Sequence, residues 1–429
     1  MKWIAVLCVI SLLLGLAGCT SESQAPEPAA PAEWFTPALD PQTEGEVRIS
    51  ANYNNFESLE AQFDVFQQYY PNIQLSYTKL DDYNNVISTA LEGADAPDIY
   101  AAFTWMEGRE TYSGVFTHAE DLSDPALGID IDCIRESILF RNADRTVPMA
   151  PVFSTTYGML INEDLFEKEG LSVPGDYSSL IDVCSAFREK GYETPLLGYD
   201  EEQSIIAILM NPFFLGQIAD DPDAVAQLNA MDPAAAELYR PSLEMIRRFA
   251  DDGFLNMDAC HALEDGYSAL ILRFFEGDIP MMLCTGDTVS GTQKRESQSE
   301  AFTAAPFAYS FVPVPITEEG GYFVDSPSMY FAVNKDSANL EAANEFMRFL
   351  ICPKSLGEMA QAKRLLNPTK DLTLDSVYVM FGEVPEERVL SPILIGIKDD
   401  PLVQLRRMGK AVFDGTMSID EAIAAFGTF

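Results

Sequence analysis

The chain has 429 residues, of which 67 are acidic and 27 basic, so its formal net charge at pH 7 is −40. A surface of this sign repels phosphate backbones, which argues against nucleic acid as a partner. At 47% hydrophobic residues, the chain is too apolar to be disordered. It is also long enough to form two domains with sizeable cores.

The N-terminus reads as a secretion signal over residues 1–18. Lys2 precedes an apolar stretch that opens at Trp3 and ends at Leu16. This stretch is shorter than the roughly 20 residues that span a bilayer, which argues against the alternative of a transmembrane anchor. Leu16-Ala17-Gly18-Cys19 resembles the lipobox of bacterial lipoproteins, which implies that Cys19 is lipidated and holds the protein at the cell membrane, outside the cytoplasm.

Residues 19–44 combine Ser, Pro, Ala and Glu without a hydrophobic period, which predicts a flexible tether behind the lipidated cysteine. Beyond Cys19 the chain holds five cysteines with no C-x-x-C or zinc-type spacing, so we expect no metal and no cofactor, and sequence leaves any disulfide pairing open. These are Cys133, Cys184, Cys260, Cys284 and Cys352.

Regular structure is predicted to begin at Val47. Residues 47–51 and 73–77 alternate as strands, residues 56–70 have helical spacing, and residues 99–103 form a short buried strand. This order indicates an α/β domain with a mainly parallel sheet. Ligands of such sheets bind beyond the carboxyl ends of the strands, so the loops at 52–55 and 103–105 are the first candidate site.

Further elements follow in the second third of the chain. A strand is expected over 157–161 and a helix after it, and a second helix should start with Ser178 or Ser179 as its cap. Another helix carries Leu238 to Phe249 on its apolar face and should end at Gly253.

Several segments, in order, resemble the family 1 extracellular solute-binding proteins of bacterial ABC importers, the group that includes maltodextrin-binding proteins. These segments are 66–73, 96–99, 157–166, 275–281, 332–337 and 342–350, with Asn367-Pro368-Thr369 after them. The resemblance implies a two-lobed, periplasmic-binding-protein-like clamshell with three interlobe crossovers. We expect these crossovers near 148–153, 279–284 and 322–328.

The same resemblance divides the chain and gives it a task. Lobe one would hold 45–150 plus 284–325, and lobe two 154–280 plus 328–429. A small solute, most simply a mono- or oligosaccharide, would be captured between the lobes by hinge closure. The protein, expected to be a monomer, would then deliver this solute to the transmembrane subunits of an ABC importer.

Sugars are recognised by aromatic rings together with side chains that pair with hydroxyl groups. Trp105 is the only indole outside the signal and the predicted tether, although a packed core role is the alternative. The other candidates combine aromatic and polar groups on predicted loops and crossovers. They are Asn52, Tyr53, Asn54, Asn55, Asp98, Phe103, Tyr157, Tyr322, Asp325, Ser326 and Tyr330, with Asn55 alternatively a helix cap.

One segment departs from the family pattern. Many members place a Trp some ten residues after the glycine of their Phe-x-x-Gly segment, whereas this chain has Gly286-Asp287-Thr288. Asp287 and Thr288 are therefore candidates for binding hydroxyl groups. Asp287 would also suit a cationic solute, or could cap the following helix.

The chain lacks the parts of most enzymes. His118 and His261 are its only histidines, and no nucleophile-elbow, zinc-protease, phosphate-loop or dinucleotide motif is present, so we expect no enzyme. A carboxylate-dependent glycosidase stays open, because acidic residues are abundant. A ligand sensor that reports to a membrane kinase would have the same fold and stays open as well.

Overall fold

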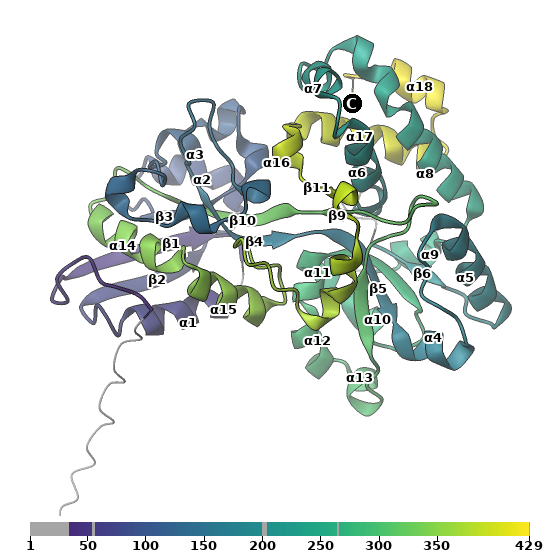
Figure 1. The fold of residues 1–429 in the computed structure, drawn as a ribbon, viewed down its shortest axis with the longest axis horizontal. Helices are drawn as coiled ribbons and strands as arrows, with labels where there is room; N and C mark the ends of the chain where they lie inside the picture. Colours follow the sequence, from purple (N-terminus) through teal and green to yellow (C-terminus); the bar gives the residue numbers. More distant parts are fainter. Residues whose placement is uncertain (1–33, 54–55, 200–203, 264–265, 429) are drawn as a thin grey trace, which may run out of the picture.

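The fold is described from a computed structural model, which describes residues 34–53, 56–199, 204–263 and 266–428. It has two lobes side by side, each built on its own β-sheet (Figure 1). The predicted signal at 1–18 and Cys19 lie outside the described residues. Within the described part of the chain, no helix is both long and apolar enough to traverse a bilayer.

Lobe one contains a five-stranded sheet in the order β2-β1-β3-β10-β4. Strands β1, β2 and β3 are parallel, as predicted, whereas β10 runs antiparallel to β3 and β4. Its strands are β1 (Gly45–Ala51), β2 (Ile73–Lys79), β3 (Ile99–Ala102), β4 (Ala150–Thr155) and β10 (Ser326–Val333). Its helices are α1 (Glu57–Phe66), α2 (Tyr83–Leu91), α3 (Ser113–Thr117), α14 (Leu340–Leu350) and α15 (Pro353–Lys363), with short 3₁₀ turns η1 (Thr104–Met106), η2 (Glu110–Tyr112), η3 (Pro125–Leu127), η4 (Ile131–Cys133) and η5 (Glu136–Ile138).

Lobe two contains a four-stranded sheet in the order β6-β7-β5-β8 and a small parallel pair, β9 with β11. Its strands are β5 (Tyr157–Asn162), β6 (Leu196–Leu197), β7 (Met281–Thr285), β8 (Tyr309–Val312), β9 (Phe323–Val324) and β11 (Val389–Leu390). Its helices are α4 (Glu163–Glu169), α5 (Tyr177–Glu189), α6 (Ser204–Ile218), α7 (Pro222–Asn229), α8 (Arg240–Asp252), α9 (Met257–His261), α10 (Gly266–Phe274), α11 (Gly286–Ser290), α12 (Thr292–Gln298), α13 (Glu300–Ala304), α16 (Pro392–Ile395), α17 (Asp399–Phe413) and α18 (Ile419–Ala424), with 3₁₀ segments η7 (Pro233–Tyr239), η8 (Ser376–Glu383) and η9 (Glu386–Arg388).

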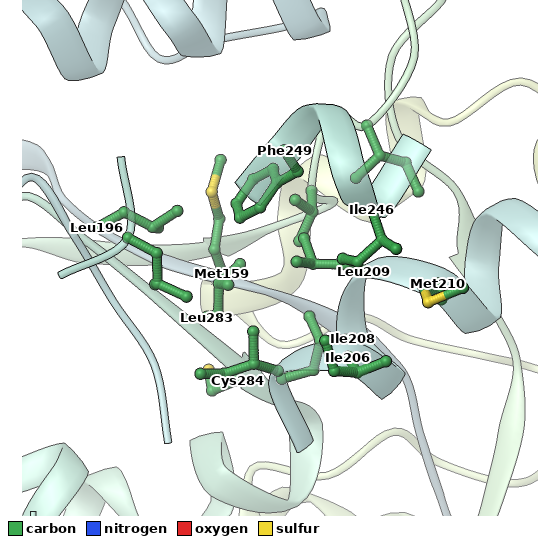
Figure 2. Close-up of a cluster of buried hydrophobic side chains, with 14 of the residues drawn as sticks. Met159, Leu196, Ile206, Ile208, Leu209, Met210, Ile246, Phe249, Leu283 and Cys284 are labelled. Carbon is green, nitrogen blue, oxygen red and sulfur yellow. The ribbon is translucent and has the colours of Figure 1, made fainter. Parts of the chain in front are cut away.

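The core of lobe two lies between this sheet and the helices α6 and α8 (Figure 2). Met159 and Leu283 come from neighbouring strands and meet Leu209 and Phe249 from the two helices. These strands are buried along nearly their whole length, so their sequences read as continuous apolar runs.

Local sequence signals explain where several helices begin and end. The Asn162 side chain accepts a hydrogen bond from the Leu165 N–H at 3.1 Å and caps α4. Helix α5 is capped by Asp176 and not by Ser178 or Ser179 as predicted, although Ser179 completes the capping box from inside the helix. Gly253 follows α8 with φ at +65°, the left-handed conformation that glycine adopts without strain.

Within the residues that the structure describes, the chain passes between the lobes three times, which confirms the number of crossovers. The crossings fall at Thr156 between β4 and β5, at Asp325 between β9 and β10, and at Leu366 after α15. The crossing expected at 322–328 therefore lies where the sequence placed it. The one expected at 148–153 falls a few residues later, because β4 still belongs to the sheet of lobe one.

The predicted lobe limits are wrong in two places. Strand β7 pairs with β5 and β6, so 279–284 is no crossing and residues 284–325 belong to lobe two. Conversely, β10, α14 and α15 pack in the core of lobe one, which takes residues 328–365 away from lobe two. The local sequence of a buried strand such as β7 does not indicate which sheet the strand joins. The prediction therefore assigned β7 and β10 to the wrong places in the two lobes.

The predicted tether ends earlier than residue 44. The Trp34 ring packs at a tilt against Phe349 with 5.1 Å between ring centroids, and Phe35 is buried in lobe one. The Ala38 N–H donates to the Glu345 carboxylate at 2.9 Å. Residues 34–44 are thus docked on lobe one, since two aromatic side chains in a Pro- and Ala-rich stretch find an apolar surface there.

Candidate functional site

Side chains of both lobes meet around Asp287, the second residue of α11 in lobe two. The Ser328 hydroxyl, on β10 of lobe one, donates a hydrogen bond of 2.5 Å to the Asp287 carboxylate. The Tyr53 hydroxyl, in the loop after β1, lies close enough to Ser328 and Asp287 for both to act on its pKa. The sequence placed Tyr53 and Asp287 in the candidate site, and the structure brings both close to Ser328.

Burial determines the protonation of this group. It raises the pKa of Asp287 above its ordinary value, while the hydrogen bond from the Ser328 hydroxyl and the nearby hydroxyl of Thr155 oppose that rise. Burial also raises the pKa of Tyr53, and the charge of Asp287 raises it further. Tyr53 therefore keeps its proton at neutral pH and can donate it in a hydrogen bond.

Tyr157, at the start of β5, extends this group towards α17. Its hydroxyl accepts a hydrogen bond of 3.0 Å from the amide of Asn211. Burial raises the pKa of Tyr157, and the charges of Arg406, Asp287 and Asp399 also act on it. Tyr157 thus stands between the buried carboxylate of α11 and the charged beginning of α17.

The Trp105 loop of lobe one reaches α17 through an ion pair. Trp105 lies in η1, stacked on Phe103 with 5.9 Å between ring centroids and packed edge-on against Tyr112. The Arg109 guanidinium lies 5.8 Å from the Trp105 ring centroid and donates to Asp399 at 2.7 Å. Trp105 is half-buried, so a packing role and a ligand-binding role are both compatible with its position.

Tyr267 is a functional candidate that the sequence reasoning missed. It is 51% exposed at the start of α10, and Arg295 lies 5.5 Å from its ring centroid. Its ring packs against Gly291, directly after α11, the helix that carries Asp287. A lone aromatic at a helix start carries no sequence signal, since only the fold brings it against α11.

Three predicted site residues are buried, with their polar groups bound by other protein groups, and we remove them from the candidate site. Asp98 accepts from the Arg48 backbone N–H at 2.7 Å and from the Ser337 hydroxyl at 2.6 Å. Tyr330 donates to the Ile138 carbonyl at 2.8 Å. Asp325 forms a buried ion pair at the second crossing.

The remaining predicted residues lie apart or contribute little. The ring of Tyr322 packs so closely on Gly216 that a Cβ at that glycine would lie 2.7 Å from it. Thr288 is buried inside α11. Ser326 is the first residue of β10 and is paired there with Thr155 of β4, and Asn52 is exposed. Asn54 and Asn55 lie outside the described residues.

Two further observations concern metal binding and surface pockets. In the described part of the chain, no cluster of three or more His, Cys, Asp or Glu side chains is arranged to hold a metal ion. A surface pocket of about 380 Å³ lies on lobe two beside β8 and η8, and its lining includes none of the predicted site residues. We place the candidate site at the lobe junction because aromatic, hydroxyl and carboxylate groups of both lobes converge there.

Comparisons with known proteins agree with this fold. A family profile described as bacterial extracellular solute-binding protein matches residues 61–385. The melibiose/raffinose/stachyose-binding protein MelE of Bacillus subtilis (strain 168) is 23% identical over 402 residues, which cover 91% of this chain and 87% of MelE.

Solved structures show the same two-lobed architecture. A sugar transporter of Bacillus licheniformis in complex with stachyose is 18% identical with a TM-score of 0.61, covering 89% of this chain and 98% of that one. The apo form of RafE from Streptococcus pneumoniae is 15% identical with a TM-score of 0.69, covering 91% and 98%. At these identities the likeness establishes the fold.

Proposed function

The chain belongs to the bacterial extracellular solute-binding proteins, and on that premise we propose that it captures an oligosaccharide between its lobes and delivers it to an ABC importer. The observation that carries this proposal is the junction around Asp287, where groups from both lobes converge. The name of MelE gives melibiose, raffinose and stachyose as its ligands, so these sugars are the first class to test.

The chemistry of the junction suits a sugar. Tyr267 and Trp105 offer aromatic faces for C–H groups, while Asp287 accepts hydrogen bonds from hydroxyls and Tyr53 donates one. Since contacts from both lobes would form only in the closed state, binding would be coupled to hinge closure. The residues that we propose to contact the sugar are Tyr53, Trp105, Tyr157, Tyr267 and Asp287.

Calorimetry with raffinose, stachyose and melibiose tests the proposal, with spermidine as the cationic comparison. We expect stoichiometric binding of at least one sugar, and unchanged sugar by mass spectrometry after prolonged incubation. Saturable binding of spermidine alone would replace the sugar by a cationic solute, which the buried carboxylate of Asp287 would equally suit. Sugar cleavage would show a glycosidase.

Lipid anchoring through Cys19 is a separate proposal that rests on the sequence resemblance of residues 16–19. Two acyl chains hold a soluble domain at a membrane that its acidic surface does not favour. The Cys19→Ala variant should therefore leave the washed membrane fraction. Retention of this variant in the membrane pellet would refute anchoring at Cys19 and leave sugar binding unaffected.

A further inference from the structure

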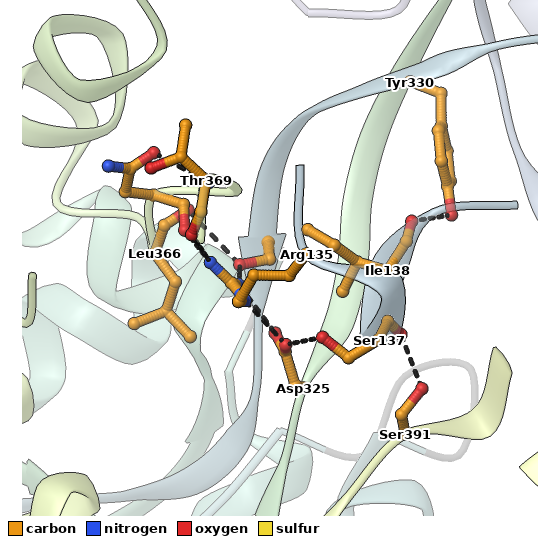
Figure 3. Close-up of polar contacts among 10 residues, drawn as sticks. Arg135, Ser137, Ile138, Asp325, Tyr330, Leu366, Thr369 and Ser391 are labelled. Carbon is orange, nitrogen blue, oxygen red and sulfur yellow. Dashed lines mark hydrogen bonds and ion pairs between the residues drawn. The ribbon is translucent and has the colours of Figure 1, made fainter. Parts of the chain in front are cut away.

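One arginine contacts all three segments that connect the lobes (Figure 3). Arg135 donates at 2.8 Å to the Ser154 hydroxyl, near the end of β4 and two residues ahead of the first crossing. It forms a two-pronged pair with Asp325 in the second crossing, with both N–O distances at 2.9 Å. In the third crossing it donates to the carbonyls of Asn367 and Thr369, the latter at 2.9 Å.

These contacts use the full capacity of the side chain. A guanidinium has five N–H donors in a rigid plane. The five hydrogen bonds from Arg135 account for all of them, and only 13% of its side chain is exposed. Lysine, with three donors on a flexible stem, would be unable to reproduce this arrangement.

Arg135 is rooted in lobe one. Its neighbours Ile134 and Ile138 are fully buried in the core of that lobe. Its backbone N–H also donates to the Pro368 carbonyl at 3.1 Å, which adds a main-chain link to the third crossing. Arg135 therefore attaches the crossings to lobe one.

Asp325 faces both lobes. Its carboxylate binds Arg135 and the Ser137 hydroxyl of lobe one, the latter at 2.5 Å. Its backbone N–H donates to the Leu390 carbonyl of lobe two at 2.8 Å. Separately, Ser154 and Leu366 exchange two backbone hydrogen bonds of 3.1 Å, which tie the end of β4, just ahead of the first crossing, to the third crossing.

We propose that Arg135 is a positioning residue for lobe closure, because its five donors bind the three crossings into a single hinge attached to lobe one. With this hinge intact, the lobes rotate about one axis. Without it, three separate linkers would bend independently. The lobes would then close in several relative orientations, and the sugar-binding groups of the two lobes would be correctly placed in fewer of them. This hinge role of Arg135 rests on the proposed function, and its first test needs no sugar.

The variant to test is Arg135→Gln combined with Asp325→Asn. Removing only Arg135 would leave a buried carboxylate unpaired and could prevent folding, whereas the double change removes both charges. The matched control is Arg348→Gln combined with Glu345→Gln. That pair is also two-pronged, with N–O distances of 2.8 Å, and lies wholly within lobe one.

Hydrogen exchange on the ligand-free full-length protein gives the readout. We expect the backbone amides of Ser154, Asp325 and Leu366 to exchange at least about tenfold faster in the Arg135 variant than in the control, because their hydrogen bonds open with the hinge. Arg135→Lys should fall between, and it replaces the double variant if the latter does not fold. Exchange at these three amides equal to that of the control would overturn the proposal.

A second readout separates positioning from stability. If a sugar binds, the Arg135 variant should bind it more weakly than the control variant does, even where the two variants melt at the same temperature. Equal affinities at equal melting temperatures would again contradict the hinge role. Failure of every sugar to bind would refute the proposed function and leave the exchange result standing.

Discussion

Leu365 and Leu366 are consecutive in the chain, yet Leu365 packs in the core of lobe one and Leu366 in the core of lobe two. The buried side chains therefore change lobes between two consecutive residues, while the backbone of Pro368 and Lys370 is still hydrogen-bonded to Arg135 and Cys133 of lobe one. The backbone of Leu366 is fixed there by its two hydrogen bonds with Ser154.

Alanine at each of these positions should destabilise a different lobe. A buried Leu→Ala change costs about 2–5 kcal/mol, depending on how well the site collapses. Hydrogen exchange should show faster opening of β1 in Leu365→Ala and of β5 in Leu366→Ala. Equal acceleration in both strands for both variants would mean that the lobes unfold as one unit.

Much of this fold could be predicted from sequence, and the failures have physical causes. The period-2 strands and the helical stripe of residues 47–77 are local signals, and they form a strand, a helix and a strand as predicted, although α1 ends at Phe66 and not near Tyr70. The allocation of β7 and β10 to sheets depends on long-range pairing, which no local pattern encodes.

The candidate site divides in the same way. Asp287 was found because it interrupts a family pattern, and Tyr53 because it follows a parallel strand. Tyr267 and Ser328 lacked such a signal, since each matters only through what the fold sets opposite it. Asp98 and Asp325 looked available for a ligand, but their partners lie far away in sequence.

Asp287→Asn should stabilise the free protein at neutral pH while weakening ligand binding. The folded state holds the proton of Asp287 more tightly than the unfolded chain, whose carboxyl has the ordinary value of 3.8. The contribution of Asp287 to the free energy of unfolding is therefore fully present below pH 3.8 and is lost as the pH rises through its raised pKa.

Melting curves between pH 3.5 and pH 7 would measure this difference. We expect Asp287→Asn to melt about 1–3 °C above the wild type at pH 7 and level with it at the acid end. A lower melting temperature for the variant at pH 7 would show that the carboxylate is needed for the fold.

Aromatic substitutions test which ring carries the sugar. Tyr267 is half exposed, so Tyr267→Ala should leave the melting temperature close to that of the wild type. Loss of a stacked ring should weaken binding by about one to two orders of magnitude. Trp105→Ala should weaken binding by about one to three orders of magnitude and lower the melting temperature as well, because Phe103 and Tyr112 pack on it.

The matched control for these two is Trp34→Phe, because Trp34 is an aromatic that packs on the outside of lobe one against Phe349. This variant should bind sugar with unchanged affinity. Calorimetry that finds Trp105→Ala within twofold of the wild type would assign Trp105 to the core alone.

The pair between Arg109 and Asp399 should bias lobe closure weakly and in a salt-dependent way. Both side chains are about one-third exposed, and such pairs contribute about 0–1 kcal/mol. Arg109→Gln should therefore weaken sugar binding by no more than about fivefold at low salt, with little difference from the wild type near 0.5 M salt. An effect that persists at high salt would point to direct contact between Arg109 and the ligand.

Glu345 should fasten the N-terminal segment to lobe one in a pH-dependent way. Burial alone would raise the pKa of Glu345, but hydrogen bonds from Arg348, the Ala38 N–H and Tyr70 lower it below the ordinary value of 4.5. The stability that these contacts give is therefore present above pH 4.5 and is lost as the pH falls through the lowered pKa. Acid should free residues 34–44 before either lobe core opens, because their attachment depends on this carboxylate.

Limited proteolysis across pH 3 to 7, using pepsin at the acid end, would detect that release as early cleavage ahead of Gly45. Glu345→Gln should be cleaved there at pH 7 as readily as the wild type is at low pH, since the amide binds the Arg348 guanidinium less strongly. Glu358→Gln is the control, because the Glu358 carboxylate pairs with Lys354 on the exposed side of α15. Cleavage ahead of Gly45 that is equally slow in Glu345→Gln and in the control would show that Trp34 and Phe35 hold the segment without help from the carboxylate.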